Sequence, residues 1–185
     1  MIVAVLLTTL ALANPAVIIA VHGEATIQTG EGSIPATRYA KIRAGTTLKT
    51  GPGARLSLRL PSGSLIRVGP QSMVELEALV QHSSAAHRKE SLKLKVGRVW
   101  AQVKALTGAD STFHIKTPQA VAGVRGTTFW AETTPETWSF ILEEGSLAVQ
   151  EREARAPLTL SGQGAGIRGS QSGGVKRFSL SAHAM

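Results

Sequence analysis

Apolar and polar residues alternate along much of the chain, with the period of two that is typical of a half-buried β-strand. Residues 55–60 show this most clearly, because leucines alternate there with Ser57 and Arg59. The segment 65–68 repeats the alternation after a Pro-Ser-Gly turn. Residues 73–80 have the length of a short helix, but their apolar residues also alternate with glutamates. We therefore predict strands in all three segments.

The alternation changes phase once within a long apolar segment, at Gly97. Leu92 and Leu94 occupy even positions before this glycine, whereas Val99 and Ala101 occupy odd positions after it. A β-bulge or bend produces such a change, because one extra residue turns all later side chains to the opposite face. Glycine tolerates the backbone angles that turns and bulges need, and we assign this structural role to Gly45, Gly63, Gly97, Gly126 and Gly145.

Short strands that are separated by glycine turns, without a convincing helix, predict an all-β protein. The periodicity alone is compatible with a sandwich, a barrel and a β-solenoid. We expect the β domain to span residues 16–168, followed by a flexible Ser/Gly-rich tail over 169–185.

Residues 1–13 are apolar and end in Ala-Leu-Ala, a pattern that suits cleavage by signal peptidase. The alternative is an uncleaved anchor over residues 1–21, in which case the protein would stay attached to the membrane. Both hypotheses place the domain outside the cytoplasm, so a periplasmic or secreted location is predicted.

The 185 residues carry a formal net charge of +8, and the sequence pI is about 10.5. The basic residues occur singly along the predicted strands, which is typical of solvated strand faces. A surface for an anionic partner is the alternative. We expect no nucleic-acid binding, because no arginine-rich run, recognition helix or zinc-ligand spacing accompanies the charge.

The residue inventory offers little for catalysis. The chain has no cysteine, and Asp110 is its only aspartate. His82 and His87 lie in a polar segment without a third metal ligand. We therefore predict a non-enzymatic protein without a catalytic site, metal or cofactor.

Several blocks of the sequence, in order, resemble the FecR-type domain of bacterial envelope proteins. The first block contains Gly45, Leu48, Thr50, Leu56, Leu58, Leu60, Gly63 and Ser64; the second contains Leu94, Gly97, Val99 and Trp100. The third and most specific block contains Phe113, Thr117, Pro118, Ala120, Val124, Arg125, Gly126, Thr127 and Phe129. Residues 144–147 and 161–163 resemble the closing strand and turn of the family.

The resemblance implies a family core over residues 45–150, a twisted right-handed β-solenoid-like fold, and an extracytoplasmic domain without a catalytic site. A β-sandwich or β-roll is the alternative fold. Thr46 and Ser62 replace aspartates that are frequent in the family, so the turns are kept without their carboxylates. Sigma-factor regulators of this family also carry a helical cytoplasmic segment, a membrane span and a receptor-contact region, and we expect this chain to lack them.

The first functional hypothesis is an envelope binding or scaffold module whose partner is a protein or an anionic polysaccharide. The alternative is an accessory component of envelope signal transduction, of the sigma-regulator or ferric-siderophore type; a hydrolytic enzyme is a distant third. Arg125, Trp130 and Trp138 are the candidate partner-binding residues, because arginine and tryptophan are frequent at binding surfaces. The alternative is structural: the two tryptophans would belong to the core or to the cap of a solenoid, and Arg125 would pair with a carboxylate or with carbonyl groups of the fold. The sequence does not indicate an oligomeric state.

Overall fold

The computed structural model describes residues 14–81, 88–105, 111–152 and 154–180, and each of these ranges contains β-strand. The predicted signal peptide, His82, His87 and Asp110 lie outside the described residues. The strands are β1 Ala16–His22, β2 Ala25–Thr29, β3 Gly32–Pro35, β4 Lys41–Ile42, β5 Thr46–Thr50, β6 Arg55–Arg59, β7 Leu65–Val68, β8 Met73–Gln81, β9 Arg88–Val103, β10 Thr112–Lys116, β11 Ala120–Val124, β12 Thr127–Thr133, β13 Thr137–Glu144, β14 Ser146–Glu151, β15 Leu158–Ser161, β16 Ala165–Ser170 and β17 Lys176–Ser179.

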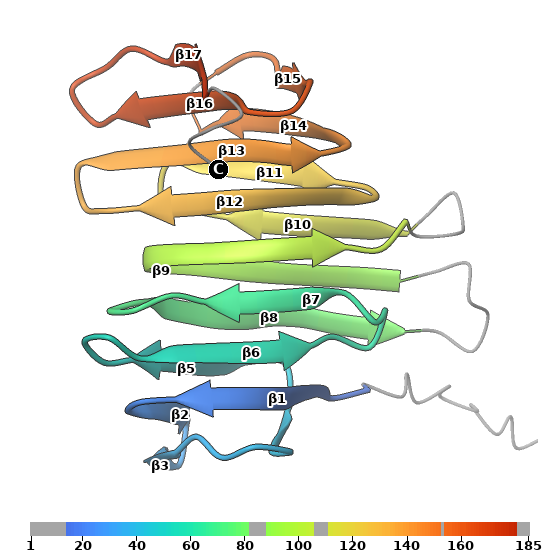
Figure 1. Ribbon diagram of the computed structural model, residues 1–185, viewed down its shortest axis with the longest axis vertical. Coiled ribbons are helices and arrows are strands. Elements are labelled where there is room, and N and C mark those ends of the chain that lie inside the picture. Colours follow the sequence, from blue (N-terminus) through green and yellow to red (C-terminus); the bar gives the residue numbers. More distant parts are fainter. Residues whose placement is uncertain (1–13, 82–87, 106–110, 153, 181–185) are drawn as a thin grey trace, which may run out of the picture.

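The strands form two layers, one behind the other, and within each layer the strands follow one another along the long axis of the molecule (Figure 1). The front sheet has the order β4-β1-β6-β7-β9-β12-β13-β16-β17. The back sheet has the order β3-β2-β5-β8-β9-β10-β11-β14-β15. Neighbouring strands are antiparallel, except that β9 and β10 are parallel. Strand β9 belongs to both sheets, because its first half pairs with β8 and its second half with β7.

The predicted all-β class is confirmed, and residues 73–80 form part of strand β8 as expected. The right-handed solenoid-like coil stays a prediction. Within the region expected to be a flexible tail, residues 176–179 form β17 and pair with residues 165–168 of β16; the domain bounds stay a prediction. The polar Ser/Gly-rich stretch between these strands forms the hairpin turn, and such composition is common to turns and tails alike.

The apolar core lies between the two sheets. Leu56 and Leu58 of β6 are buried, whereas Arg55 and Arg59 on the same strand are exposed. The same alternation on the facing strands brings buried leucine, isoleucine, valine and phenylalanine side chains together in one cluster. Each sheet therefore contributes one apolar face to the core and presents its other face outward.

Gly97 is the point at which β9 passes from the back sheet to the front sheet. Its φ angle is +94°, and the register of β8 against β9 shifts between Met73 and Val74, just before this point. Leu94 is buried before the crossing and Val99 after it, so the side-chain phase changes as the sequence predicts. The other turn glycines, at positions 45, 63, 126 and 145, have φ angles of +85°, +84°, +59° and +91°.

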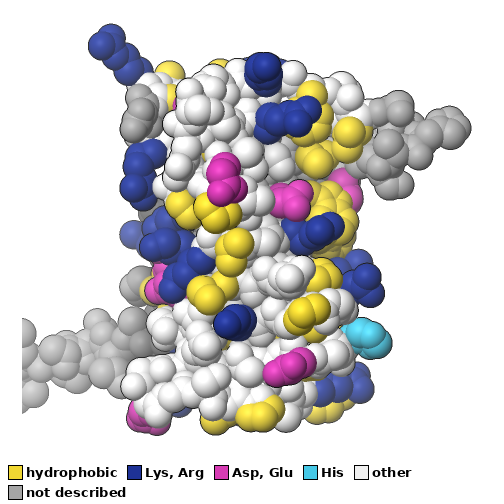
Figure 2. All heavy atoms as spheres, turned by 90° about the vertical axis from the view of Figure 1, so that its left-hand side faces the viewer, with side chains coloured by type: hydrophobic (Ala, Val, Ile, Leu, Met, Phe, Trp, Pro, Cys, Tyr) yellow, Lys and Arg dark blue, Asp and Glu magenta, His cyan; other side chains and the backbone are white. Residues whose placement is uncertain are grey.

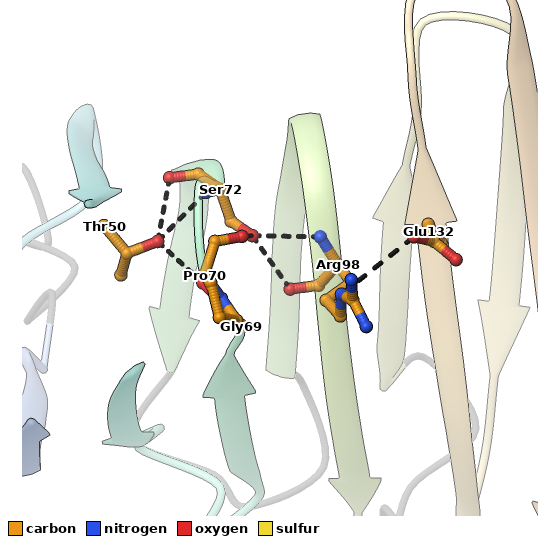
Figure 3. Close-up of polar contacts among 6 residues, drawn as sticks. All are labelled: Thr50, Gly69, Pro70, Ser72, Arg98 and Glu132. Carbon is orange, nitrogen blue, oxygen red and sulfur yellow. Dashed lines mark hydrogen bonds and ion pairs between the residues drawn. The ribbon is translucent and has the colours of Figure 1, made fainter. Parts of the chain in front are cut away.

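Buried hydroxyl groups complete the hydrogen bonding where the chain changes sheets (Figure 3). Thr50 Oγ1 donates to the carbonyl of Gly69 over 2.6 Å and accepts from the backbone N–H of Ser72 over 3.0 Å. Ser72 Oγ accepts from the backbone N–H of Arg98 over 3.0 Å and donates to the carbonyl of Pro70 over 2.9 Å. Since the regular ladder is interrupted here, these side chains pair backbone groups that would otherwise be buried without partners.

A second buried polar cluster lies at the opposite ends of the strands. Glu90 of β9 is 3% exposed. Its Oε1 accepts from the backbone N–H of Ser62 over 2.8 Å, and its Oε2 accepts from the Ser62 hydroxyl over 2.7 Å. Burial raises the pKa of Glu90, and the two hydrogen bonds from Ser62 offset only part of that rise. The cluster ties the turn between β6 and β7 to β9, and so helps to place β7 beside β9 in the front sheet.

We expect Gly97→Ala to destabilise the fold much more than Gly53→Ala. A Cβ atom at position 97 would lie 2.6 Å from Ser72 Cα, whereas a Cβ at position 53 would meet no heavy atom within 4 Å. Both glycines have positive φ, so both variants carry the strain of about 1–2 kcal/mol for a left-handed residue. Only Gly97→Ala adds steric overlap, at a further cost of about 1–3 kcal/mol. Urea unfolding of both variants measures the difference, and equal losses of stability would contradict the close packing at Gly97.

We expect Glu90→Gln to make the free energy of unfolding less dependent on pH. Because the folded-state pKa of Glu90 is raised above 4.5, its contribution to stability is fully present below pH 4.5 and is lost as the pH rises through the folded pKa. Glutamine stays neutral: its carbonyl oxygen can accept from the Ser62 N–H, and its amide N–H can donate to the Ser62 hydroxyl oxygen once that hydroxyl turns. Its advantage over the wild type should therefore grow as the pH rises above 4.5. Glu90→Ala should instead lose about 1–3 kcal/mol, because it leaves the Ser62 N–H buried without its acceptor. Chemical unfolding at several pH values tests both; a pH-independent difference between Glu90→Gln and wild type would be the contrary result.

Candidate recognition surface on the front sheet

Four side chains form a row across the outward face of the front sheet. Arg67 of β7 is in register with Trp100 of β9, Trp100 with Trp130 of β12, and Trp130 with Ile141 of β13. The core-facing neighbours of these residues on each strand are buried, so the row points away from the core. We call Arg67, Trp100, Trp130 and Ile141 the tryptophan row.

One carboxylate holds both indole rings of the row. Trp100 Nε1 donates to Glu143 Oε2 over 3.0 Å, and Trp130 Nε1 donates to Glu143 Oε1. The β12–β13 register explains this position, because Thr128 pairs with Glu144 and Phe129 with Leu142, which leaves Glu143 as the extra residue of a bulge. Bulges commonly redirect a side chain in this way. With both carboxylate oxygens engaged, Glu143 fixes the two rings and is poorly placed to act as a general base.

Arg67 completes the row from the next strand. Its guanidinium group lies over the Trp100 ring, 4.4 Å from the ring centroid. A cation–π contact at an exposed site contributes about 0.5–1 kcal/mol. Trp100 is therefore held on its edge by Glu143 and on its face by Arg67, whereas Trp130 remains 40% exposed. Arg67 and Trp130 are the exposed residues of the row, and the indole of Trp130 is its exposed aromatic surface.

A shallow hollow of about 260 Å³ lies beside Trp130. Its lining combines apolar and polar side chains: Arg98, Trp130, Ala131, Glu132, Ser139, Ile141 and Leu180. Arg98 Nε lies 4.0 Å from Glu132 Oε1, so these two charges form a loose pair at the rim (Figure 3). The site thus offers one large aromatic surface with hydrogen-bonding groups around it, which suits non-covalent recognition.

The structure separates the three residues that the sequence suggested for partner binding. Trp130 lies on the surface, and its binding role stays a prediction. Trp138 does not lie on the surface, because it is 1% exposed and its ring packs against Phe140, with ring centroids 5.9 Å apart. The expectation of a binding role for Trp138 is wrong, because a partner cannot reach the buried ring. Gly169 explains how the ring fits: it is in register with Trp138, and a Cβ at position 169 would lie 2.6 Å from the indole.

Arg125 is exposed in the turn between β11 and β12, away from the tryptophan row. It lines a different hollow, together with Phe113 and His114 of β10. The partner-binding role of Arg125 stays a prediction. The sequence analysis did not single out Glu143, because its bulge lies at the end of β13, where no further apolar residue of the strand follows to show a change of phase.

The described residues contain no group of three or more His, Cys, Asp or Glu side chains that could hold a metal ion. In the same part of the chain, no helix is both long and apolar enough to cross a membrane.

Residues 46–148 match the family model described as "FecR protein", and this range covers more than half of the chain. The chain belongs to the FecR family. The match includes all four residues of the tryptophan row and Glu143, so the row and its anchor lie within the FecR domain. No curated protein matches the sequence.

Two crystal structures of a "putative anti-sigma factor" from Parabacteroides distasonis resemble the fold of this FecR protein. Each superposes with a TM-score of 0.62 at 16% sequence identity. The alignment covers 74% of this chain and 61% of the other, so the chain matches about three fifths of the neighbour's length. At this identity the likeness shows a shared fold.

We expect Glu143→Gln to change the environment of two of the three tryptophan indole N–H groups. A glutamine side chain has one carbonyl acceptor, so it cannot accept from both Trp100 and Trp130 as the carboxylate does. In a ¹H–¹⁵N spectrum two indole resonances should move, while that of buried Trp138 should stay. The loss of one charge-assisted hydrogen bond should lower stability by about 1 kcal/mol. Glu136→Gln on an exposed turn is the control, and unchanged indole resonances in Glu143→Gln would contradict the shared anchor.

Proposed function

We propose that this FecR protein is a non-catalytic, extracytoplasmic component of envelope signal transduction, and that it binds a protein partner through the tryptophan row. The observation that carries the proposal is the exposed Trp130 indole, which is held in place by Glu143 beside the stacked pair of Arg67 and Trp100. Family membership and the anti-sigma description of the structural neighbour support the signalling part.

The composition and rigidity of the row favour a protein partner. Tryptophan and arginine are the residues that most often dominate the binding energy of protein interfaces. A side chain that is already fixed loses less conformational entropy when a partner covers it. The two indoles are fixed by Glu143, and Arg67 is stacked on one of them. The row therefore has the properties of a preorganised hot spot.

The signalling hypothesis, which was the alternative in the sequence analysis, takes precedence over the scaffold hypothesis. Family membership and the likeness to a protein described as an anti-sigma factor both favour a regulator over a passive scaffold. An extracytoplasmic location is part of the proposal, and it rests on the signal-like residues 1–13 and on the family resemblance.

The test is transcriptional. Deletion of the gene should change the expression of a defined set of genes, and the wild-type protein should restore it. Trp130→Ala should restore it poorly, because removal of a hot-spot tryptophan costs about 2 kcal/mol or more of binding free energy, which is roughly a 30-fold weaker complex. Tyr39→Ala is the matched control, since Tyr39 is another exposed aromatic, at 66%, near the N-terminal end of the stack.

A photo-crosslinking amino acid at position 130 identifies the partner in the same cells, and one at position 39 controls for random capture. A signalling role predicts a regulator or receptor component that is crosslinked from position 130 only. Full restoration by Trp130→Ala, or an unchanged transcriptome after deletion, would refute the proposal.

A further inference from the structure

The outward face of the back sheet carries a second hollow, of about 530 Å³, whose chemistry differs from that of the tryptophan row. It lies over β8, β9, β10, β11 and the end of β14. Its lining is Glu77, Lys93, Lys116, Thr117, Ala120, Val121, Gln150, Glu151 and Arg152. This lining has no aromatic residue, and most of its side chains are charged or carry hydrogen-bonding groups.

The strand register places cations side by side in this hollow. Lys93 of β9 is in register with Lys116 of β10. Arg152 follows β14 directly, and its backbone N–H donates to the carbonyl of Gln119 over 2.8 Å, which holds the residue at the rim. Three cationic side chains from three segments therefore surround one depression.

Two carboxylates form ion pairs with lysines on this face. Lys116 Nζ lies 2.7 Å from Glu77 Oε2, and Lys95 Nζ lies 2.9 Å from Glu75 Oε2. Burial raises the pKa of Glu77, but hydrogen bonds from Lys116 and Ser91 and the nearby lysine charges outweigh it, so the pKa is lowered overall and the carboxylate stays ionised.

Cations nevertheless outnumber carboxylates on this side of the molecule. The exposed or half-buried cations are Lys49, Lys89, Lys93, Lys95, Lys116 and Arg152, and the carboxylates are Glu75, Glu77 and Glu151. Figure 2 shows Lys and Arg side chains gathered at its left edge, which is the side of the back sheet. An excess of positive charge on an extended, shallow face attracts a polyanion.

We propose that this hollow, the basic groove, binds an acidic polysaccharide, a polymer whose sugar rings carry carboxylate groups. Lys93, Lys116 and Arg152 would pair with the carboxylates of the polymer. Glu77, Glu151 and Gln150 would accept hydrogen bonds from its hydroxyl groups, and Thr117 borders the same depression.

The mixed lining favours a polysaccharide over a nucleic acid. Phosphate groups along a backbone offer few hydrogen-bond donors, and Glu77 and Glu151 would repel them. Proteins that bind single strands without sequence preference stack the bases on aromatic side chains, and the basic groove has none. A sugar polymer carries both anionic groups for the lysines and hydroxyl donors for the carboxylates. The groove lies on the opposite sheet from the tryptophan row, so this inference stands apart from the proposed protein partner.

The experiment measures binding of the whole protein to a defined oligouronate, such as an alginate hexasaccharide, by isothermal titration at low and moderate salt. Lys93→Gln with Arg152→Gln removes two cations from the basic groove. Arg55→Gln with Arg59→Gln removes two exposed cations from the front sheet and is the matched control. The groove variant should bind at least ~10-fold more weakly, and the control within ~2-fold of the wild type. Thermal unfolding checks that both double variants fold.

Three further probes test the class of ligand: a neutral dextran oligomer, a single-stranded oligonucleotide and a polyglutamate peptide of matched charge. Binding should weaken in the order oligouronate, polyglutamate or oligonucleotide, dextran. Glu151→Gln should lower the preference for oligouronate over oligonucleotide, because it removes both a hydroxyl acceptor and a charge that repels phosphate. Equal weakening in both double variants would overturn the groove, and tighter binding of the oligonucleotide or polyglutamate would overturn the ligand class. Trp130→Ala should leave oligouronate binding unchanged; a large loss would place the sugar site on the front sheet instead.

Discussion

The crossing of β9 between the two sheets is the constraint on which the rest of the structure depends. One strand of sixteen residues pairs with β8 and β10 in the back sheet and with β7 and β12 in the front sheet. The two sheets are therefore held at a set distance and register by a covalent link as well as by the core. The crossing requires a residue with positive φ next to Ser72, and glycine meets that requirement because it has no Cβ atom. Were β9 shifted by one residue, Trp100 would face the core instead of the surface.

Polar side chains are needed at the two sides of the strand stack, near opposite ends of β7, where the backbone ladder is interrupted. Thr50 and Ser72 satisfy the corner beside Gly97, and Ser62 and Glu90 satisfy the opposite corner. These side chains stabilise the fold mainly by providing partners for backbone groups that would otherwise be buried without one. Each such unpaired donor or acceptor would cost about 1–3 kcal/mol. Glu90 is an exception among them, because burial works against its charge. The fold thus uses an ionisable group where a neutral amide would serve, which links its stability to pH.

The two outward faces have different chemistry because the strands bury only one side of each sheet. The front sheet displays indoles in a row that a single bulged glutamate holds together. The back sheet displays lysines that neighbouring strands bring into register. Strand pairing therefore brings aromatic residues together on one surface and basic residues on the other, although both kinds are scattered along the sequence. A protein partner for the first and an acidic polysaccharide for the second are compatible, since neither surface covers the other.

The sequence by itself determined the strands, their buried faces, the phase change at Gly97 and the FecR family, because each depends on residues that are close along the chain or on blocks in a fixed order. It did not distinguish Trp130 from Trp138, since both occur on strands with apolar alternation. Only the tertiary structure decided between them: Trp138 faces the core, where Gly169 leaves room for its ring, whereas Trp130 faces outward beside Trp100. The role of Glu143 also depended on the fold, because a bulge arises from the register between two strands. The basic groove has the same origin, since Lys93 and Arg152 meet only through the pairing of β9, β10, β11 and β14.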